Sequence, residues 1–413
     1  MQYGLIGEKL GHSYSKVIHE MMGMYSYDLK EIERDNLQEY ITGRSYKGLN
    51  VTIPYKQDVM PMLDYIDAGA ANIGAVNTIV NKDGKLSGYN TDYYGLKYLI
   101  ESTGCSLENK KVLILGTGGT SRTARCVASN LKAQDIIIVG RSNKEGCITY
   151  DEAIANHSDA SFMINTTPCG MYPNIGVAPI CLDTFKALEA LVDVVYNPAR
   201  TQLMIDAAAH GIKAYGGLKM LVYQAIAAAE LFTGNKVDDK TVDKIYKTVR
   251  LSNENIVFIG MPAVGKTTVG KRIARELDMT FIDTDDEIVA REGRAISDIF
   301  ATDGEEYFRK VESAVIEDVS KRKGCVIATG GGAVTRQNNV DVLKAFGQLY
   351  LLERNLEELI PTGDRPLSND REKMQRLYEE RMPIYRKVAD VIIDANDGLY
   401  ATVDRIMRCI SEY

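Results

Sequence analysis

Residues 260–267, Gly-Met-Pro-Ala-Val-Gly-Lys-Thr, constrain the fold more than any other segment of the chain. They follow the apolar run 256–259 and precede an amphipathic stretch, so we expect a strand, a tight turn and a helix in that order. The glycines of such a P-loop let backbone N–H groups surround phosphate oxygens at the positive end of the helix. Lys266 can then reach the terminal phosphates of a nucleotide, and the Thr267 hydroxyl can bind magnesium. A bare strand-to-helix turn would need neither side chain.

Short apolar segments alternate with amphipathic helical segments along most of the chain. The alternation predicts an α/β protein in which helices cover parallel sheets. The strands we expect are residues 112–115, 136–139, 162–164, 191–195, 256–259, 326–328 and 349–352. Ligands of such folds gather beyond the carboxyl ends of the strands, so the residues that follow these runs are candidates for a site.

Two breaks in the pattern divide the chain. A polar stretch at 102–110 precedes one strand, and residues 251–254 separate an expected helix, 238–249, from the strand at 256–259. The expected division is a first domain at 1–102 with the helices of about 216–250 packed back onto it, a dinucleotide-binding Rossmann domain at 103–215, a linker at 251–254 and a P-loop domain at 255–413.

Composition limits the classes of partner. The 413 residues, 45% of them hydrophobic, suffice for two or three domains with buried cores. A net charge of −7 leaves no positive excess for nucleic acid. No apolar run approaches the about 20 residues that a membrane helix needs, so we expect a cytoplasmic protein without a membrane partner. The seven cysteines are scattered, which argues against disulfides and structural zinc.

Acidic residues and glycines follow the next strands of the P-loop domain. Asp283 and Asp285 lie two residues apart, on the same side of an extended chain, so one can serve magnesium and the other an acceptor hydroxyl. Asp285 or Asp286 could instead cap the following helix. The strand at 326–328 leads into three glycines, 330–332, which permit close approach of a ligand to the backbone.

A second glycine turn follows the strand at 112–115, where Gly116, Gly118 and Gly119 would let a pyrophosphate lie at a helix N-terminus. The next strand ends at Arg141 and Ser142 rather than at an acidic residue. An acidic residue would bind a free ribose hydroxyl, whereas these two suit a 2′-phosphate, so the expected cofactor is NADP. Arg141 could instead be a solvent-facing charge.

Polar clusters follow strand-like runs in the first hundred residues, at 11–15, 50–56, 74–78 and 90–92. They supply hydroxyls, amides, the lysine Lys56 and the carboxylate Asp92. These groups suit a polyhydroxylated, anionic substrate and do not form a metal-ligand set.

Residues 1 to about 250 resemble shikimate dehydrogenase in these clusters, in the glycine turn, and in the segments 165–168, 196–198 and 217–220. The resemblance implies that Lys56 and Asp92 form the catalytic pair, because hydride reduction of a ketone leaves an alkoxide that needs a proton. It assigns the substrate carboxylate to Ser13 and Ser15, the ring hydroxyls to Thr52, Asn77 and Gln224, and a further substrate contact to Tyr196. It assigns the cofactor to Gly116, Gly118, Gly119, Arg141, Ser142, Asn165, Thr166, Gly217 and Met220.

Two positions depart from the dehydrogenase pattern. Lys219 stands where the family commonly has glycine, and Gly140 where it commonly has asparagine. Taken alone, Lys56 could be a solvated lysine and Asp92 a helix N-cap.

From Asn255 to the end the chain resembles shikimate kinase, in the P-loop, 283–285, 308–309, 330–332, 365–367 and 381–386. The resemblance implies that Arg309 and Arg381 clamp the substrate carboxylate. Asp285 would bind the ring hydroxyls and accept the proton of the attacking one, and Arg365 would arrive on a mobile lid and stabilise the transition state.

The backbone of Gly331 and Gly332 would also contact the substrate. The implied nucleotide contacts are Gly260, Ala263, Val264, Gly265, Lys266, Thr267, Thr268 and Arg365, and the implied magnesium ligands are Thr267 and Asp283. Ala263 replaces a usual glycine, and the segment 353–368 is shorter than a typical lid.

Together the two resemblances imply NADPH-dependent reduction of 3-dehydroshikimate to shikimate, followed by MgATP-dependent phosphorylation of the 3-hydroxyl. Two alternatives stay open. One is a quinate-accepting dehydrogenase joined to a kinase of another polyol acid such as gluconate, and the other is a chain in which one half only senses its ligand. The sequence leaves a homo-oligomer open.

Overall fold

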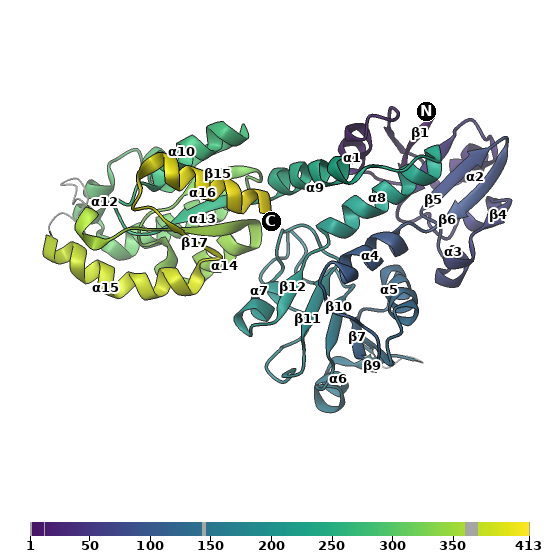
Figure 1. Ribbon diagram of the computed structural model, residues 1–413, viewed down its shortest axis with the longest axis horizontal. Helices are drawn as coiled ribbons and strands as arrows, with labels where there is room; N and C mark the ends of the chain where they lie inside the picture. Colours follow the sequence, from purple (N-terminus) through teal and green to yellow (C-terminus); the bar gives the residue numbers. More distant parts are fainter. Residues whose placement is uncertain (1, 12, 143–145, 360–370, 413) are drawn as a thin grey trace. The chain divides into compact units, whose positions relative to one another are not determined.

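The computed structural model describes residues 2–11, 13–142, 146–359 and 371–412. The chain forms two compact units, one of residues 1–197 and 201–249 and the other of residues 198–200 and 250–413. Each unit combines helices with largely parallel sheets (Figure 1), so the expected α/β class is confirmed. No helix in the described part of the chain is long and apolar enough to span a membrane.

The first unit begins with a mixed sheet in the order β2-β1-β3-β5-β6-β4. The elements of this region are β1 (Tyr3–Gly7), α1 (Ser15–Met21), β2 (Asp28–Glu31), α2 (Arg34–Thr42), β3 (Gly48–Val51), η1 (Met60–Met62), β4 (Tyr65–Ile66), α3 (Ala68–Ile73), β5 (Thr78–Lys82) and β6 (Lys85–Tyr89). β1 pairs in parallel with β2 and β3, whereas β5 runs antiparallel to β3 and β6. Ile6, Leu49 and Ile79 pack in one core with Leu37 and Ile41 of α2.

A second, all-parallel sheet follows in the order β12-β11-β10-β7-β8-β9. Its elements are β7 (Lys111–Leu115), α5 (Gly119–Asn130), β8 (Asp135–Gly140), β9 (Ile148–Thr149), α6 (Tyr150–Asn156), β10 (Phe162–Asn165), β11 (Ala190–Asp193), α7 (Gln202–Ala209) and β12 (Lys213–Tyr215). Successive side chains of β7 enter different cores, Val112 and Ile114 on one face and Leu113 and Leu115 on the other. Burial on both faces explains why these strands are continuous apolar runs.

Three helices complete the first unit: α4 (Asp92–Glu101), α8 (Leu218–Thr233) and α9 (Asp239–Asn253). In Figure 1, α8 lies beside α4, and it also contacts α1 and β5. Val222 and Ile226 of α8 share a core with Ile18 of α1 and Ile245 of α9. The helices after the second sheet therefore pack against elements of the first 102 residues.

The linker expected at 251–254 is helical for most of its length, because α9 continues to Asn253 and β13 begins at Asn255. Residues 251–253 contain neither Gly nor Pro, so no helix breaker ends α9 earlier. Val249 is buried, and Arg250 lies in the last turn, where a cation favours the helix dipole.

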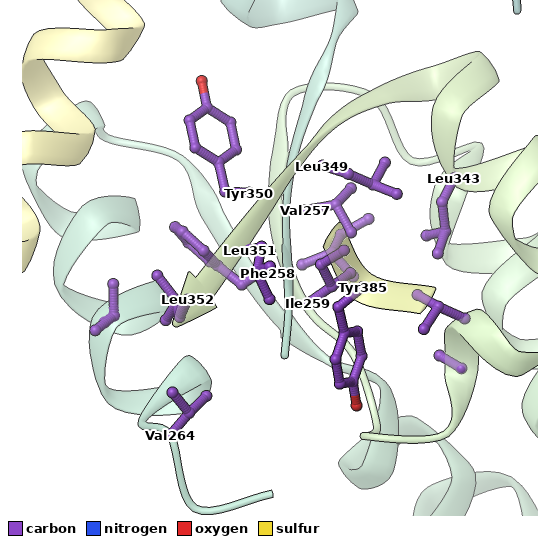
Figure 2. Packing of buried hydrophobic residues seen from close by; sticks show 14 of the residues in the cluster. Val257, Phe258, Ile259, Val264, Leu343, Leu349, Tyr350, Leu351, Leu352 and Tyr385 are labelled. Carbon is purple, nitrogen blue, oxygen red and sulfur yellow. The ribbon is translucent and has the colours of Figure 1, made fainter. Parts of the chain in front are cut away.

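The second unit is built on an all-parallel sheet in the order β14-β15-β13-β16-β17. Its elements are β13 (Asn255–Ile259), α10 (Lys266–Leu277), β14 (Thr280–Asp283), α11 (Thr284–Glu292), α12 (Ile296–Thr302), α13 (Gly304–Ser320), β15 (Cys325–Ala328), η2 (Ala333–Thr335), α14 (Gln337–Phe346), β16 (Gly347–Glu353), η3 (Leu356–Glu358), α15 (Arg371–Val388), β17 (Val391–Asp394) and α16 (Gly398–Glu412). Figure 2 shows the core on this sheet, where Val257 of β13 and Leu349 of β16 meet Leu343 of α14.

Candidate active sites

The first unit contains a polar cavity of about 270 Å³. Polar side chains come from the loop before α1 and its first residue, from the end of β3 and the turn after it, from the residue before β5 and from the first residue of α4. Residues of β1, of the segment after β11 and of α8 line the rest. The predicted residues that meet there are Ser13, Ser15, Thr52, Lys56, Asn77, Asp92, Tyr196, Gly217, Met220 and Gln224. A cavity of this size and polarity suits a small molecule with several hydroxyl groups.

Lys56 and Asp92 form an ion pair in this cavity, with 2.5 Å between Nζ and Oδ2. Both side chains are partly exposed, 29% and 21%, so a ligand can reach them. Asp92 is the first residue of α4, and Thr91, not Asp92, is the N-cap. The carboxylate is thus free to orient the Lys56 ammonium group toward a reacting atom.

Asn50, which belongs to the predicted cluster 50–56 but was given no role of its own, lines the same cavity. Its side chain hydrogen-bonds Tyr27 and Thr78 inside the first sheet. Asn50 precedes Thr52 by two residues in an extended segment, so the two side chains face the same side. That spacing is the signal that could have identified it.

The glycine turn after β7 forms an open helix N-terminus. Gly116 has φ +110°, and a Cβ there would lie 2.7 Å from Oγ1 of Thr166, so only glycine fits. A Cβ on Gly118 or Gly119 would meet nothing within 4 Å. The positive end of α5 is therefore open to a phosphate group.

Arg141 and Ser142 follow β8 and are exposed; the adjoining segment 143–145 lies outside the described residues. Gly140, immediately before them, is one of the two departures from the family pattern, and its neighbours explain it. A Cβ on Gly140 would lie 2.8 Å from Sγ of Cys147 and 2.9 Å from Cγ2 of Thr117. The Cys147 side chain occupies the space that a larger residue at 140 would need.

The Asn165 side chain, which the resemblance assigns to the cofactor, makes its hydrogen bonds inside the protein. Asn165 is fully buried; its Nδ2 donates to Oδ2 of Asp193 (3.0 Å), and its Oδ1 accepts from the Thr167 hydroxyl (2.7 Å). The physical reason is the register, which places Asn165 opposite Asp193 on the adjacent strand. The neighbouring Thr166 hydroxyl donates to the Leu115 carbonyl (2.6 Å).

The second departure, Lys219, does not line the cavity. Its ammonium group lies 5.7 Å from the centre of the Tyr246 ring on α9. Burial lowers the pKa of Lys219. The charge that Lys219 adds relative to glycine therefore lies over an aromatic ring of the neighbouring helix and not in the cavity.

The second unit has a cavity of about 350 Å³ at the P-loop, lined by Ala263, Gly265, Lys266, Thr267, Thr268, Asp283, Asp285, Thr329, Arg354 and Glu358. The Lys266 ammonium group donates to the carbonyls of Gly260 (2.8 Å) and Met261 (2.9 Å) within its own loop. The Thr267 hydroxyl donates to Oδ2 of Asp283 (2.7 Å). These two oxygen ligands suit Mg²⁺, which prefers hard oxygens.

Not every P-loop residue lines that cavity. Val264 is buried, and a Cβ on Gly260, which has φ +140°, would lie 2.7 Å from the Leu352 carbonyl oxygen. Gly260 therefore permits the turn, and Val264 packs into the core. Ala263 adopts φ +65°, a conformation that glycine tolerates better.

A larger cavity of about 630 Å³ lies next to it, and Asp285 lines both. It brings together the other predicted substrate residues of this unit, Arg309, Gly331, Gly332 and Arg381. Asp283, not Asp285 or Asp286, caps α11, because its side chain accepts from the Asp285 backbone N–H. The Asp285 carboxylate is thereby left at the junction of the two cavities. Arg365 lies outside the described residues.

Arg309 is held against the backbone of Gly332, where a Cβ would lie 2.1 Å from Nη1. The same guanidinium group donates a hydrogen bond to the Glu312 carboxylate, with 2.7 Å between Nη1 and Oε2. Glu312 is 1% exposed, lines the cavity, and its Oε1 has no hydrogen-bond partner among the described residues. The sequence reasoning missed Glu312; its position three residues after Arg309 on one helix face is the available signal.

Comparisons with known proteins cover both units. Three family models match: "Shikimate dehydrogenase substrate binding domain" at residues 5–79, "Shikimate 5'-dehydrogenase C-terminal domain" at 217–250 and "Shikimate kinase" at 262–411. The chain is 39% identical over 265 residues to a "Shikimate dehydrogenase (NADP(+))" of Clostridium perfringens, covering 60% of this chain and 98% of that protein. It is 35% identical over 259 residues to the protein so named in Methanococcus maripaludis, covering 57% and 92%.

Solved structures agree over the same part of the chain. A chorismate mutase/shikimate 5-dehydrogenase fusion protein from Clostridium acetobutylicum is 36% identical, with a TM-score of 0.57, covering 60% of this chain and 96% of that chain. A shikimate 5-dehydrogenase from Thermus thermophilus, solved in complex with NADP(H) and shikimate, is 26% identical with a TM-score of 0.54, covering 60% and 99%.

Proposed function

Since the chain belongs to the shikimate dehydrogenase family and carries a shikimate kinase domain after it, we propose that its two sets of cavities work on one metabolite in succession. The chain is a bifunctional shikimate-pathway enzyme. Its first unit reduces 3-dehydroshikimate to shikimate with NADPH, and its second phosphorylates shikimate with ATP and magnesium. The main structural support for the dehydrogenase site is the Lys56–Asp92 ion pair inside the polar cavity.

In the dehydrogenase, Ser13 and Ser15 would bind the substrate carboxylate, and Thr52, Asn77 and Gln224 the ring hydroxyls. NADPH, when bound, supplies the hydride. Lys56 would donate the proton that the developing alkoxide requires, and Asp92 would hold the Lys56 ammonium group in place. The open end of α5 would receive the pyrophosphate, and Arg141 with Ser142 the 2′-phosphate.

In the kinase, Arg309 and Arg381 would hold the substrate carboxylate with their planar guanidinium groups. Asp285 would accept the proton of the attacking hydroxyl, since it lines both the substrate cavity and the phosphate cavity. Lys266 would exchange its loop carbonyls for phosphate oxygens, and Thr267 with Asp283 would hold magnesium. The roles thus follow from positioning and charge, which dominate catalysis of phosphoryl transfer.

Two assays on the intact chain test this function. The first follows NADP reduction with shikimate, and the second follows ADP release with shikimate, ATP and magnesium. Activity in both is expected. If only one assay shows no activity, the function assigned to that unit is wrong. If neither shows activity although both cofactors bind, the assignment of shikimate as the substrate is wrong.

A further inference from the structure

We propose that Thr78 is a positioning residue of the dehydrogenase: with Asn50 and Thr91 it fixes the side-chain amide of Asn77 so that Nδ2 faces the substrate as a hydrogen-bond donor. Thr78 lies behind the cavity wall and is fully buried, so it does not touch the substrate itself. The inference rests on the proposed dehydrogenase function. It adds the direction of a substrate hydrogen bond and the residues that determine it.

The orientation of the Asn77 amide follows from a backbone group. The N–H of Thr91 points at one side-chain atom of Asn77 over 2.7 Å, and a backbone N–H can only donate, so that atom is the oxygen Oδ1. The hydroxyls of Thr78 (3.0 Å) and Thr91 (3.2 Å) contact the same oxygen. Oδ1 is therefore committed to the protein, and Nδ2 remains for the cavity that Asn77 lines.

The direction of the hydrogen bond between Asn50 and Thr78 follows from a second backbone group. The side chain of Asn50 lies 3.4 Å from the Asn77 carbonyl, which can only accept, so the atom facing it is Nδ2. The same Nδ2 donates to Oγ1 of Thr78 (3.1 Å). Thr78 thus receives one proton from Asn50, and its own hydroxyl proton serves Oδ1 of Asn77 (3.0 Å) or Oγ1 of Thr91 (3.1 Å), whose hydroxyl contacts the same Oδ1.

At the Asn50 end of this hydrogen-bond network, two aromatic side chains cover the buried polar groups. The Tyr27 hydroxyl donates to Oδ1 of Asn50 (2.7 Å), and the His19 ring is stacked on Tyr27 with 4.0 Å between centroids. Burial lowers the pKa of His19 to about 3, so His19 is neutral near pH 7. Buried polar groups that are fully paired resist reorientation, because each unpaired group costs about 1–3 kcal/mol.

A donor at Asn77 selects an oxygen lone pair on the substrate. A ring hydroxyl that accepts from Nδ2 keeps its own proton for another partner in the cavity. If Thr78 loses its hydroxyl, Oδ1 of Asn77 loses a contact at 3.0 Å, the Thr91 hydroxyl loses a neighbour at 3.1 Å, and Asn50 Nδ2 loses an acceptor. The amide is then less constrained, and substrate binding weakens while dinucleotide binding stays unchanged.

The test compares Thr78→Val with Thr78→Ser in the full chain. Val preserves the shape and removes the hydroxyl, whereas Ser retains the hydroxyl. We expect Thr78→Val to raise the KM for shikimate on the order of tenfold, with the KM for NADP within about twofold of wild type, and Thr78→Ser to remain near wild type. An unchanged shikimate KM in Thr78→Val, or a parallel rise of both KM values, would overturn the proposal.

A second variant covers the case in which Thr78→Val fails to fold. Asn77→Asp keeps the shape and the acceptor at Oδ1 but replaces the Nδ2 donor with an oxygen. Calorimetric titration with shikimate should show a large loss of affinity, and NADPH binding should persist. Wild-type affinity for shikimate in Asn77→Asp would refute the donor role. A wild-type chain that binds shikimate without oxidising it would refute the proposed function instead, and the affinities of the variants would still decide this inference.

Discussion

Glu312 and Arg309 form a buried ion pair one turn apart on α13, with 2.7 Å between Oε2 and Nη1. Burial raises the pKa of the Glu312 carboxyl, and the Arg309 charge opposes that increase. The pair directs the guanidinium group along the backbone of Gly332 into the kinase cavity. Under the proposed function, a substrate carboxylate would therefore meet an arginine whose position is set before binding.

Replacing Glu312 by Gln should raise the KM for shikimate in the kinase assay by roughly tenfold, because hydrogen bonds to a charged group are worth about 1.5–3 kcal/mol and the amide makes a weaker one. The KM for ATP should change little. Glu305→Gln is the matched control, since Glu305 contacts the same arginine at 3.0 Å with a side chain that is 52% exposed. Exposed pairs contribute about 0–1 kcal/mol, so equal effects of the two variants would contradict this account.

Lys56→Ala should lower kcat of the dehydrogenase by about a hundredfold or more, the usual effect of losing a general acid. Asp92→Asn should lower it as well, because the amide binds the Lys56 ammonium group less firmly. Kinase activity of the same chain should stay at the wild-type level in both variants. Lys97→Ala removes a comparably exposed lysine paired with Glu101 on α4 and should leave both activities intact; a loss there equal to that in Lys56→Ala would remove the argument for a specific role.

The buried Asp193 should make the stability of the first unit depend on pH. Burial raises the pKa of Asp193 from 3.8 to about 6, although Asn165, Thr201 and the Val195 N–H all donate to it. The folded state therefore holds this proton at a pH where the unfolded chain has released it. The resulting stabilisation is fully present below about pH 4 and is lost as the pH rises through about 6, with a limit of roughly 3 kcal/mol.

Chemical denaturation of wild type and Asp193→Asn at several pH values between 4 and 7, followed by circular dichroism, isolates this contribution. The difference between the two proteins should change across the interval, since Asn does not titrate and other groups cancel. A difference that is constant with pH would show that Asp193 has an ordinary pKa in the folded state.

Local patterns were enough to predict the glycine turns and seven of the strands, most of them central in their sheets. All seven expected strands are present within a residue or two, because a run buried on both faces must be apolar and the turns after it need glycine. The clusters around Lys56 and Asp92 were predictable for the same reason, as each follows a strand. Lys56 and Asp92 are brought together by the order of the strands in the sheet, which cannot be read from any short segment.

Other features depend on partners distant in the sequence. The hydrogen bond from the Asn165 amide to Asp193 depends on the register of two adjacent strands, which the local sequence does not specify. The role proposed for Thr78 depends on Asn50 and Thr91, which only the folded sheet brings beside Asn77 and Thr78. Glu312 looked like any solvated residue of an amphipathic helix until the burial of Arg309 was known.

Gly140 and Cys147 should behave as a coupled pair near the dinucleotide site. Gly140→Asn introduces the residue common in the family, but its Cβ would approach Sγ of Cys147 at 2.8 Å. We expect this variant to raise the KM for NADP several-fold, because Arg141 and Ser142, which follow directly, must shift. Adding Cys147→Ala should restore the KM part of the way toward wild type, since it removes the contact with Sγ but leaves Cγ2 of Thr117 at 2.9 Å. Steady-state kinetics of the two single variants and the double variant give the coupling energy, and strictly additive effects would show that Cys147 does not determine the residue at 140.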